Sequence, residues 1–175
     1  GSTCKSLTSH IDIAPTILSI AGVSKADITD FAGRKLPGRD IMPALNNPKA
    51  STIHTVRENA LFTYSGIATN DSEVVRIIAE AKAKGEKPLM AIAKARYVPN
   101  LKKRGTVRSV FDGQYRFSRY FSPMERNSPK NLTELFANND VELFDLTADP
   151  AEMKNLAVDA QKNAALLEKM NTKLE

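Results

Sequence analysis

Apolar positions recur at helical spacing close to the start of the chain. Asp12 is placed to cap the N-terminus of this helix, Pro15 falls within its first turn, and Gly22 can end it in a left-handed C-cap. The apolar side chains cover more than one side of the helix, so we expect it to be buried on several sides. The positions that carry the pattern are Ile13, Ile17, Leu18, Ile20 and Ala21.

Residues 70 to 85 repeat the helical pattern over a longer stretch. A capping box of Asn70 and Glu73 begins the helix, and Gly85 ends it after two lysines. Pro88 then opens a second, shorter apolar helix with the sequence PLMAIAKA. The stripe that predicts the first of these helices consists of Val74, Ile78 and Ala81.

Strand patterns dominate the second half. Residues 106 to 121, TVRSVFDGQYRFSRYF, predict a hairpin around a type I′ turn at Asp112 and Gly113. Residues 58 to 64 and 141 to 146 predict further strands, and Asp149 is placed to cap a helix that has Pro150 at its first position.

A closing helix over residues 159 to 174 completes the pattern, with its apolar stripe facing the sheet. The order of elements predicts an α+β fold, in which an antiparallel sheet of about four strands packs against a C-terminal helix.

Composition narrows the chemistry without identifying it. The 175 residues contain 25 Lys and Arg against 20 Asp and Glu, a net charge of +5. Cys4 is the single cysteine, so the chain cannot form an internal disulfide, and with only His10 and His54 it offers no zinc-ligand set. No apolar run approaches a membrane span. From the residues alone, we interpret Asp12 as a cap and the basic stretch 94 to 108 as a solvated loop, with phosphate contact as the alternative.

Three stretches resemble one enzyme family, in the same order along the chain. TSHIDIAPTILSIAGV with GRKLPGRDIMPAL resembles the segment that follows the catalytic core of sulfatases, RSVFDGQYRFSRYF their next hairpin, and ELFDLTADPAEMKNLA their closing strand and turn. Sulfatases resemble alkaline phosphatase, with a large α/β domain and a smaller C-terminal domain. The resemblance implies that residues 1–50 end the catalytic domain and residues 51–175 form the C-terminal subdomain, with a helical basic insertion at about 66–105.

The resemblance also implies a catalytic centre that this segment lacks. Sulfatases carry a formylglycine, made from Cys or Ser in a C-x-P-x-R or S-x-P-x-R motif, beside a calcium or magnesium ion. Cys4 is followed by Ser6 where the motif has Pro and by Thr8 where it has Arg. We therefore expect no catalytic residue, no metal ligand and no bound cofactor in this segment.

The expected role of the segment is scaffold and one wall of the substrate cleft. His10, Tyr64 and Arg108 are the candidates for the cleft, and the structural residues are Asp12, Gly22, Gly113 and Asp149. The implied partners are the missing N-terminal α/β domain and a sulfated small molecule or glycan, with no nucleic acid and no membrane. The family fits a periplasmic or secreted location.

The helical segments at the start are expected to belong to the edge of that missing α/β core. Ile13, Ile17 or Leu18 should then be exposed in this chain alone. Two alternatives stay open. One is a phosphodiesterase or phosphonate hydrolase of the same superfamily, and the other is a free-standing module that binds polyanions.

Overall fold

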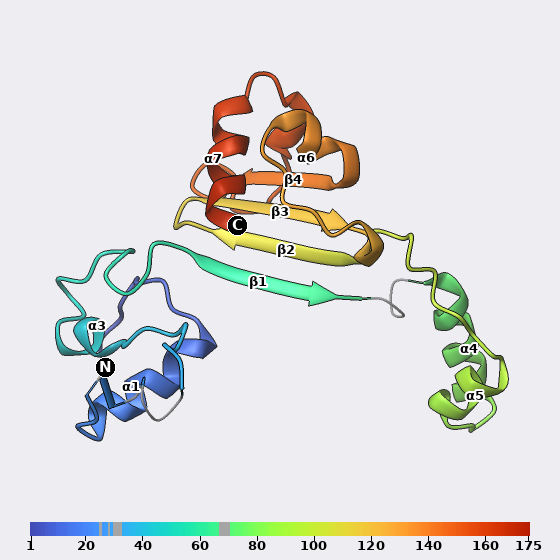
Figure 1. Ribbon diagram of the computed structural model, residues 1–175, viewed down its shortest axis with the longest axis horizontal. Coiled ribbons are helices and arrows are strands. Elements are labelled where there is room, and N and C mark those ends of the chain that lie inside the picture. The colour runs from blue at the N-terminus through green and yellow to red at the C-terminus, as the bar shows by residue number, and fades with distance from the viewer. Residues whose placement is uncertain (25, 28, 30–32, 67–70) are drawn as a thin grey trace.

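The computed structural model describes residues 1–24, 26, 27, 29, 33–66 and 71–175. Its centre is a four-stranded antiparallel sheet in the order β1-β2-β3-β4 (Figure 1). The predicted α+β class and the number of strands are therefore confirmed. The strands are β1 (Ala60–Ser65), β2 (Thr106–Phe111), β3 (Tyr115–Phe121) and β4 (Asp140–Asp145).

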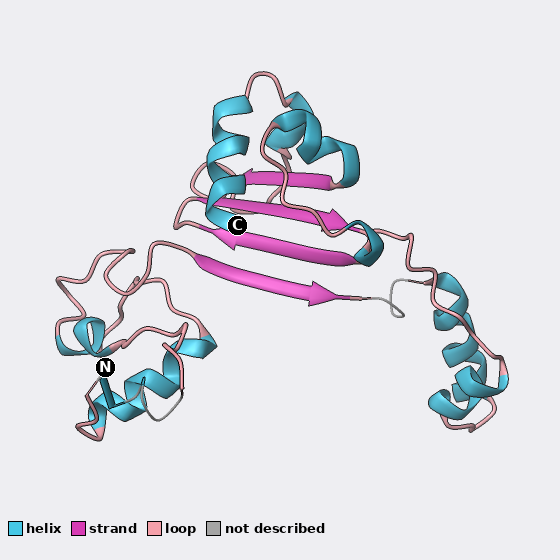
Figure 2. Ribbon diagram, viewed as in Figure 1, coloured by secondary structure: helices cyan, strands magenta, loops and turns pink. Residues whose placement is uncertain are grey.

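Helices cover one face of this sheet, as Figure 2 shows. They are α6 (Leu132–Asn138), the 3₁₀ turn η3 (Leu156–Asp159) and α7 (Ala164–Leu174). The core forms between this layer and the inward side chains of β2, β3 and β4. Its buried members are Val110, Phe117, Leu135, Val141, Leu143, Ala157, Leu167, Met170 and Leu174.

The β2–β3 hairpin is present, but its turn differs from the predicted one. Phe111 pairs with Arg116, and the Asp112 N–H donates to the Tyr115 carbonyl, so the two central residues are Gly113 and Gln114. Gly113 has a φ of +100°, whereas Gln114 is not among the residues with positive φ. This is the type II′ pattern, and the predicted type I′ turn over Asp112 and Gly113 is wrong by one residue. The Asp112 carboxylate instead accepts the N–H groups of Gln114 and Tyr115.

The segment after β4 is a turn, so the prediction that Asp149 caps a helix is wrong. The Asp149 carboxylate accepts the Lys154 N–H at 2.8 Å, and α7 begins only at Ala164. The reason lies in Asn155, whose side-chain amide accepts from Leu143 N–H and donates to the Val141 carbonyl along the free edge of β4. Holding the chain in this position stops a helix from starting at Pro150.

The described residues between 1 and 57 form a lobe beside β1 (Figure 1), with 3₁₀ turn η1 (His10–Asp12), α1 (Ile13–Ile20) and α3 (Met42–Asn46). Gly22 ends α1 as predicted. It has a φ of +78°, and the Val23 N–H reaches back to the Leu18 carbonyl as in a Schellman motif.

One face of this lobe is apolar and exposed. Leu18 is half-buried, whereas four isoleucines along η1 and α1 are about half exposed or more. The expectation that Ile13 and Ile17 would be exposed is confirmed, and burial of the helix on several sides is not seen in this chain. The exposed residues are Ile11, Ile13, Ile17 and Ile20.

A helical hairpin, α4 (Ser72–Ala83) and α5 (Pro88–Lys94), connects β1 to β2 at the far end of the sheet (Figure 1). Asp71 is its N-cap and accepts the Glu73 N–H; Asn70, the predicted cap, lies outside the described residues. A further 3₁₀ turn, η2 (Pro123–Glu125), follows β3. Of the helices that the structure describes, none has the length and apolar character needed to cross a bilayer.

Replacing Gly113 tests the hairpin turn. A Cβ added at Gly113 would lie 2.9 Å from Ile53 Cγ1, and the φ of +100° strains any other residue. We expect Gly113→Ala to lower the free energy of unfolding by about 1–3 kcal/mol. Gly85→Ala is the control, because Gly85 has a φ of +69° but no heavy atom within 4 Å of an added Cβ. Urea denaturation should show a smaller loss for Gly85→Ala, and equal losses would contradict the role given to the contact with Ile53.

Candidate functional site

The best-defined polar centre of the N-terminal lobe surrounds Asp12, which is fully buried. Its carboxylate accepts hydrogen bonds from Arg57 Nε at 3.0 Å and Nη2 at 2.5 Å, and from the N–H groups of Ser9 and Arg39 at 2.7 and 2.8 Å. Asp12 therefore joins three segments that are far apart in sequence. It does not cap α1 with its side chain as predicted; it caps the preceding 3₁₀ turn from within, by reaching back to Ser9.

The loop before α3 is pressed onto α1 at the same place. A Cβ added at Gly38 would lie 1.9 Å from the Ile11 carbonyl oxygen, so no other residue fits there. Thr16 completes the contact: its hydroxyl donates to the Asp12 carbonyl at 2.6 Å and accepts the Ile41 N–H at 3.0 Å. The stretch GRKLPGRDIMPAL thus packs on TSHIDIAPTILSIAGV through the close approach at Gly38 and through backbone N–H groups that donate to the side chains of Asp12 and Thr16.

Asp12 is built to stay ionised. Burial raises the pKa of its carboxyl, but the hydrogen bonds from Arg57, Arg39 and Ser9 outweigh burial and leave the pKa below its usual value. A carboxylate with four donors and no open side is a structural ion, because proton transfer to a substrate needs an accessible oxygen.

The three candidates for the substrate cleft do not come together. His10 is exposed and lines a shallow cleft of about 330 Å³ with Ile13, Ile41 and Leu61, but without Tyr64 or Arg108. Tyr64 pairs with Val107 on the neighbouring strand. Because side chains alternate along a strand, Arg108 points to the opposite face of the sheet from Tyr64. There its guanidinium carbon lies 5.9 Å from the centre of the Phe121 ring. A shared role of these residues stays a prediction.

A larger cleft, of about 720 Å³, lies between α1 and the loop before α3. Among its lining residues are Ser19, Lys35, Arg39 and Asp40, and the Ser19 hydroxyl donates to the Asp40 carboxylate at 2.7 Å. Lys35 and Arg39 are both exposed and suit an anionic group. Sequence reasoning did not single them out, although the three cations within GRKLPGR, beside glycines and a proline, could have indicated a basic loop.

The part of the chain that the structure describes holds no fitting ligand set for the divalent cation that the resemblance implies. Among the described residues, no group of three or more His, Cys, Asp or Glu side chains could hold a metal ion. Cys4 is half-buried, and hydrogen bonds with Ser6 lower the pKa of its thiol. No step of a reaction is assigned to Cys4 or to a metal in this chain.

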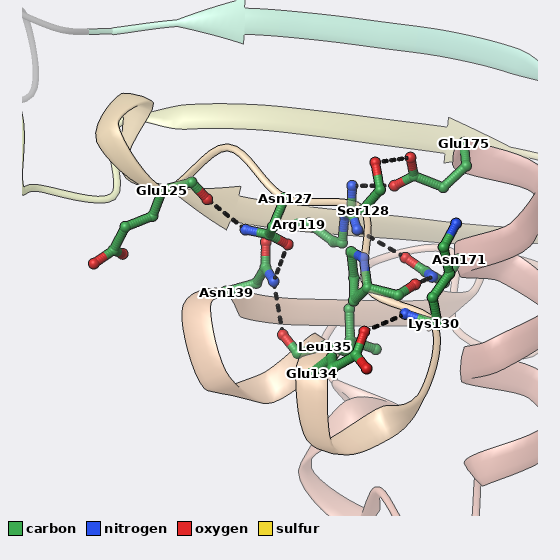
Figure 3. A network of polar contacts seen from close by, with 11 residues as sticks. Arg119, Glu125, Asn127, Ser128, Lys130, Glu134, Leu135, Asn139, Asn171 and Glu175 are labelled. Carbon is green, nitrogen blue, oxygen red and sulfur yellow. Dashed lines mark hydrogen bonds and ion pairs between the residues drawn. The ribbon is translucent and has the colours of Figure 1, made fainter.

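Arg119 is a second buried ion that sequence reasoning did not single out. It is fully buried on the helix-covered face of the sheet, and burial lowers the pKa of its guanidinium. Its Nη1 donates to Asn171 at 3.0 Å and its Nη2 to Glu175 at 2.6 Å, while Ser128 donates to the other Glu175 oxygen (Figure 3). Strand alternation could have indicated its burial, since Arg119 lies two residues from Phe117. The network ties α7 to β3 and serves the fold.

Comparison with known proteins gives matches at the level of structure. No family model matches the chain, and no curated protein does. A phosphonate monoester hydrolase of Agrobacterium radiobacter aligns with a TM-score of 0.53 and 18% identity, over 97% of this chain and 24% of its own. A Bacteroides thetaiotaomicron protein described with the metabolism of multiple glycosaminoglycans, whose label ends in 4S-sulf, gives 0.51 and 20%, over 94% of this chain and 25% of its own.

The chain therefore spans about a quarter of the length of each solved hydrolase. At these identities the likeness establishes the fold alone. That fold is the one found in sulfatases and related hydrolases of the alkaline phosphatase superfamily, and it agrees with a C-terminal segment of such a protein.

Removing the charge of Asp12 tests the buried ion pair. Asp12→Asn keeps the shape but leaves Arg57 buried without its counter-ion, so we expect the free energy of unfolding to fall by about 3–5 kcal/mol. Chemical denaturation measures the loss. Asp12→Asn combined with Arg57→Gln should lose clearly less than the sum of the two single changes, and additive losses would contradict the pairing.

The same pair predicts a pH dependence. The folded-state pKa of Asp12 is lowered, so its contribution to stability is present above the unfolded value of about 3.9 and is lost as the pH falls through the lower folded value. Denaturation midpoints measured from pH 6 downward should fall below about pH 4, and less steeply in Asp12→Asn than in the unsubstituted chain. Parallel curves would show that Asp12 does not couple folding to protonation.

Proposed function

We propose that this chain is the C-terminal segment of a sulfatase, and that the complete protein hydrolyses sulfate esters. The observation that supports this most is the match to about a quarter of two hydrolases over nearly the whole of this chain, in a segment that also carries the sulfatase-like stretches at Asp12 and Asp149. The segment supplies scaffold and one wall of the substrate cleft. A periplasmic or secreted location belongs to the same proposal.

The exposed apolar face of η1 and α1 is the surface that meets the rest of the enzyme. Its isoleucines lie on the outer side of a lobe whose inner side is fixed by Asp12 and Arg57. Exposed apolar clusters of this kind mark interfaces, and the α/β domain that the sulfatase resemblance implies would cover it. The side of the lobe around Asp12 and Arg57 then stabilises the fold, and its exposed side contacts the α/β domain.

The reaction centre belongs to the rest of the protein under this proposal. The described residues offer no metal ligand set, and Cys4 does not lie in the formylglycine motif, which agrees with a reaction centre outside this segment. Formylglycine supplies the nucleophile for the sulfur atom in that family. The exposed Lys35 and Arg39 are the cations of this segment best placed, beside α1, to contact an anionic substrate.

A phosphonate monoester hydrolase is the second candidate, because the structure with a TM-score of 0.53 carries that activity in its name. A free-standing polyanion-binding module is a third, from a different class. Only the two enzyme candidates require that another part of the complete protein covers the apolar face of η1 and α1.

Activity measured on the complete protein tests the proposal. Turnover of an aryl sulfate should exceed that of the matched aryl phosphonate monoester by at least about tenfold in kcat/KM, or about 1.4 kcal/mol of transition-state stabilisation. The 175-residue segment by itself should show no turnover above a buffer blank. A preference for the phosphonate ester would favour the second candidate. If the complete protein turned over neither ester, both the sulfatase and the phosphonate hydrolase hypotheses would be contradicted.

A further inference from the structure

The α4–α5 hairpin is a firm projection that stands apart from the core. Buried Val74, Ile77 and Ala81 hold α4 against its neighbours. Gly85, with a φ of +69°, turns the chain in a Schellman motif, in which the Glu86 N–H reaches the Ala81 carbonyl at 2.8 Å. Asp71 pairs with Lys103 at 3.2 Å and closes the base. These contacts fix the backbone of the hairpin, so its surface residues have defined positions.

Positive charge is concentrated on this projection and on the loop that leads from it to β2. Residues 82 to 104 contain eight Lys and Arg against Glu86 alone, a net charge of +7, whereas the rest of the chain carries 17 basic and 19 acidic residues, a net charge of −2. Of the eight cations, only Lys94, Lys103 and Arg104 form salt bridges within the described part of the chain. The other five are exposed: Lys82, Lys84, Lys87, Arg96 and Lys102.

Two of these cations sit where local structure disfavours them. Lys87 is the N-cap of α5 without a side-chain hydrogen bond, at the positive end of a helix, where Ser, Thr, Asp or Asn is preferred. Arg96 follows the C-cap of α5 with a φ of +49°, in the left-handed position that glycine usually takes. The helix dipole accounts for Lys82 and Lys94, which lie in last turns, but not for Lys87 or Arg96. Residues kept against local preference are typical of functional sites.

We propose that the α4–α5 hairpin is a docking site for a sulfated polysaccharide, outside the substrate cleft. The inference rests on the proposed function, since it assigns the complete enzyme a polymeric substrate that carries several sulfate groups. The hairpin binds the chain of the polymer while the cleft of the complete enzyme acts on one ester.

The arrangement favours a polymer over a small anion. The five exposed cations come from the end of α4, the turn between the two helices and the loop after α5, and neither cleft described above includes them. One exposed ion pair is weak in water, but a polyanion that meets several cations at once releases several counter-ions. The charge of the hairpin, opposite in sign to that of the rest of the chain, selects for such a partner.

Other polyanions fit less well. Single-stranded nucleic acids are bound by exposed aromatic rings on which bases stack, and Tyr97, the only aromatic residue between 82 and 104, is half-buried. An anionic membrane would use exposed apolar side chains beside the cations. Those of this segment come from α4, from α5 and from the loop after α5, so no single helix face carries them all: Val75, Leu89, Met90, Val98 and Leu101. A sulfated polysaccharide needs the charges alone.

The test uses the complete protein and dextran sulfate as the probe, with uncharged dextran as the blank. Lys87→Ser and Arg96→Gly together replace two cations by the residues that their positions prefer. We expect the affinity for dextran sulfate at low salt to fall by at least about tenfold, and the slope of log K against log salt to shrink by about 1.5. The melting temperature should hold or rise, which separates lost binding from lost folding.

A matched control removes the same charge elsewhere. Lys154→Ser with Lys162→Ser changes two exposed lysines near the closing segment and should leave dextran sulfate binding unchanged. Three results would each overturn the proposal. They are an equal loss of dextran sulfate affinity in the two double variants, an unaltered affinity in the Lys87→Ser, Arg96→Gly variant, and no binding of dextran sulfate by the unsubstituted protein. Binding to phosphatidylglycerol vesicles that is tighter than to dextran sulfate, and that Leu89→Ser with Met90→Ser abolishes, would overturn it in favour of a membrane.

Turnover of a small aryl sulfate distinguishes this inference from the proposed function. Suppose that the Lys87→Ser, Arg96→Gly variant binds dextran sulfate as tightly as the unsubstituted protein does, while aryl sulfate is turned over. The proposed docking site is then wrong and the sulfatase proposal stands. If dextran sulfate binding depends on the hairpin while no sulfate ester is turned over, the sulfatase proposal fails and the chain is a polyanion-binding protein.

Discussion

The N-terminal lobe depends on the ion pair between Asp12 and Arg57. Both side chains are buried, and the Asp12 carboxylate also receives the N–H groups of Ser9 and Arg39. An unpaired charge in this position would be costly, so the three chain segments that supply the donors must stay together. Arg57 lies three residues before β1, so the same contact fixes where the sheet begins. The contact of the β2–β3 turn with Ile53 then joins the lobe to the central hairpin.

This arrangement divides the molecule into surfaces with different tasks. The helices α6 and α7 bury one face of the sheet and form the core with β2, β3 and β4. The lobe around Asp12 turns its isoleucines outward, and the α4–α5 hairpin holds its cations away from the core. A sulfatase segment of this design would use its first surface for folding, its second for contact with the catalytic domain and its third for the substrate polymer.

Sequence patterns predicted the elements better than their ends. The strands, the closing helix and Gly22 followed from periodicity and from the demand for positive φ, which are local properties. Asp is a preferred helix cap, yet the carboxylates of Asp12 and Asp149 accept other hydrogen bonds. Asp12 binds Arg57, 45 residues away, and Asp149 accepts the Lys154 N–H in a turn that Asn155 holds against β4. Long-range contacts of this kind outweigh a local preference, and a single sequence does not show them.

The candidate cleft shows the same limit. His10, Tyr64 and Arg108 were chosen by chemical type and position in the family-like stretches, whereas register places Tyr64 and Arg108 on opposite faces of the sheet. Alternation could have revealed this, and also the buried position of Arg119, once the pairing of β1 with β2 was known. The lysine and arginine of the larger cleft depend on how the loop before α3 folds onto α1, which only the structure gives.

The most direct test of the account is the effect of Ile17→Asp on stability in two contexts. Ile17 is 59% exposed in this chain, so the change should alter the free energy of unfolding of the 175-residue segment by no more than about 0.5 kcal/mol. In the complete protein the same side chain should face the α/β domain, where a buried unpaired carboxylate should cost about 3 kcal/mol or more. A small effect in both contexts would show that the apolar face of α1 is not an interface and would contradict the central claim.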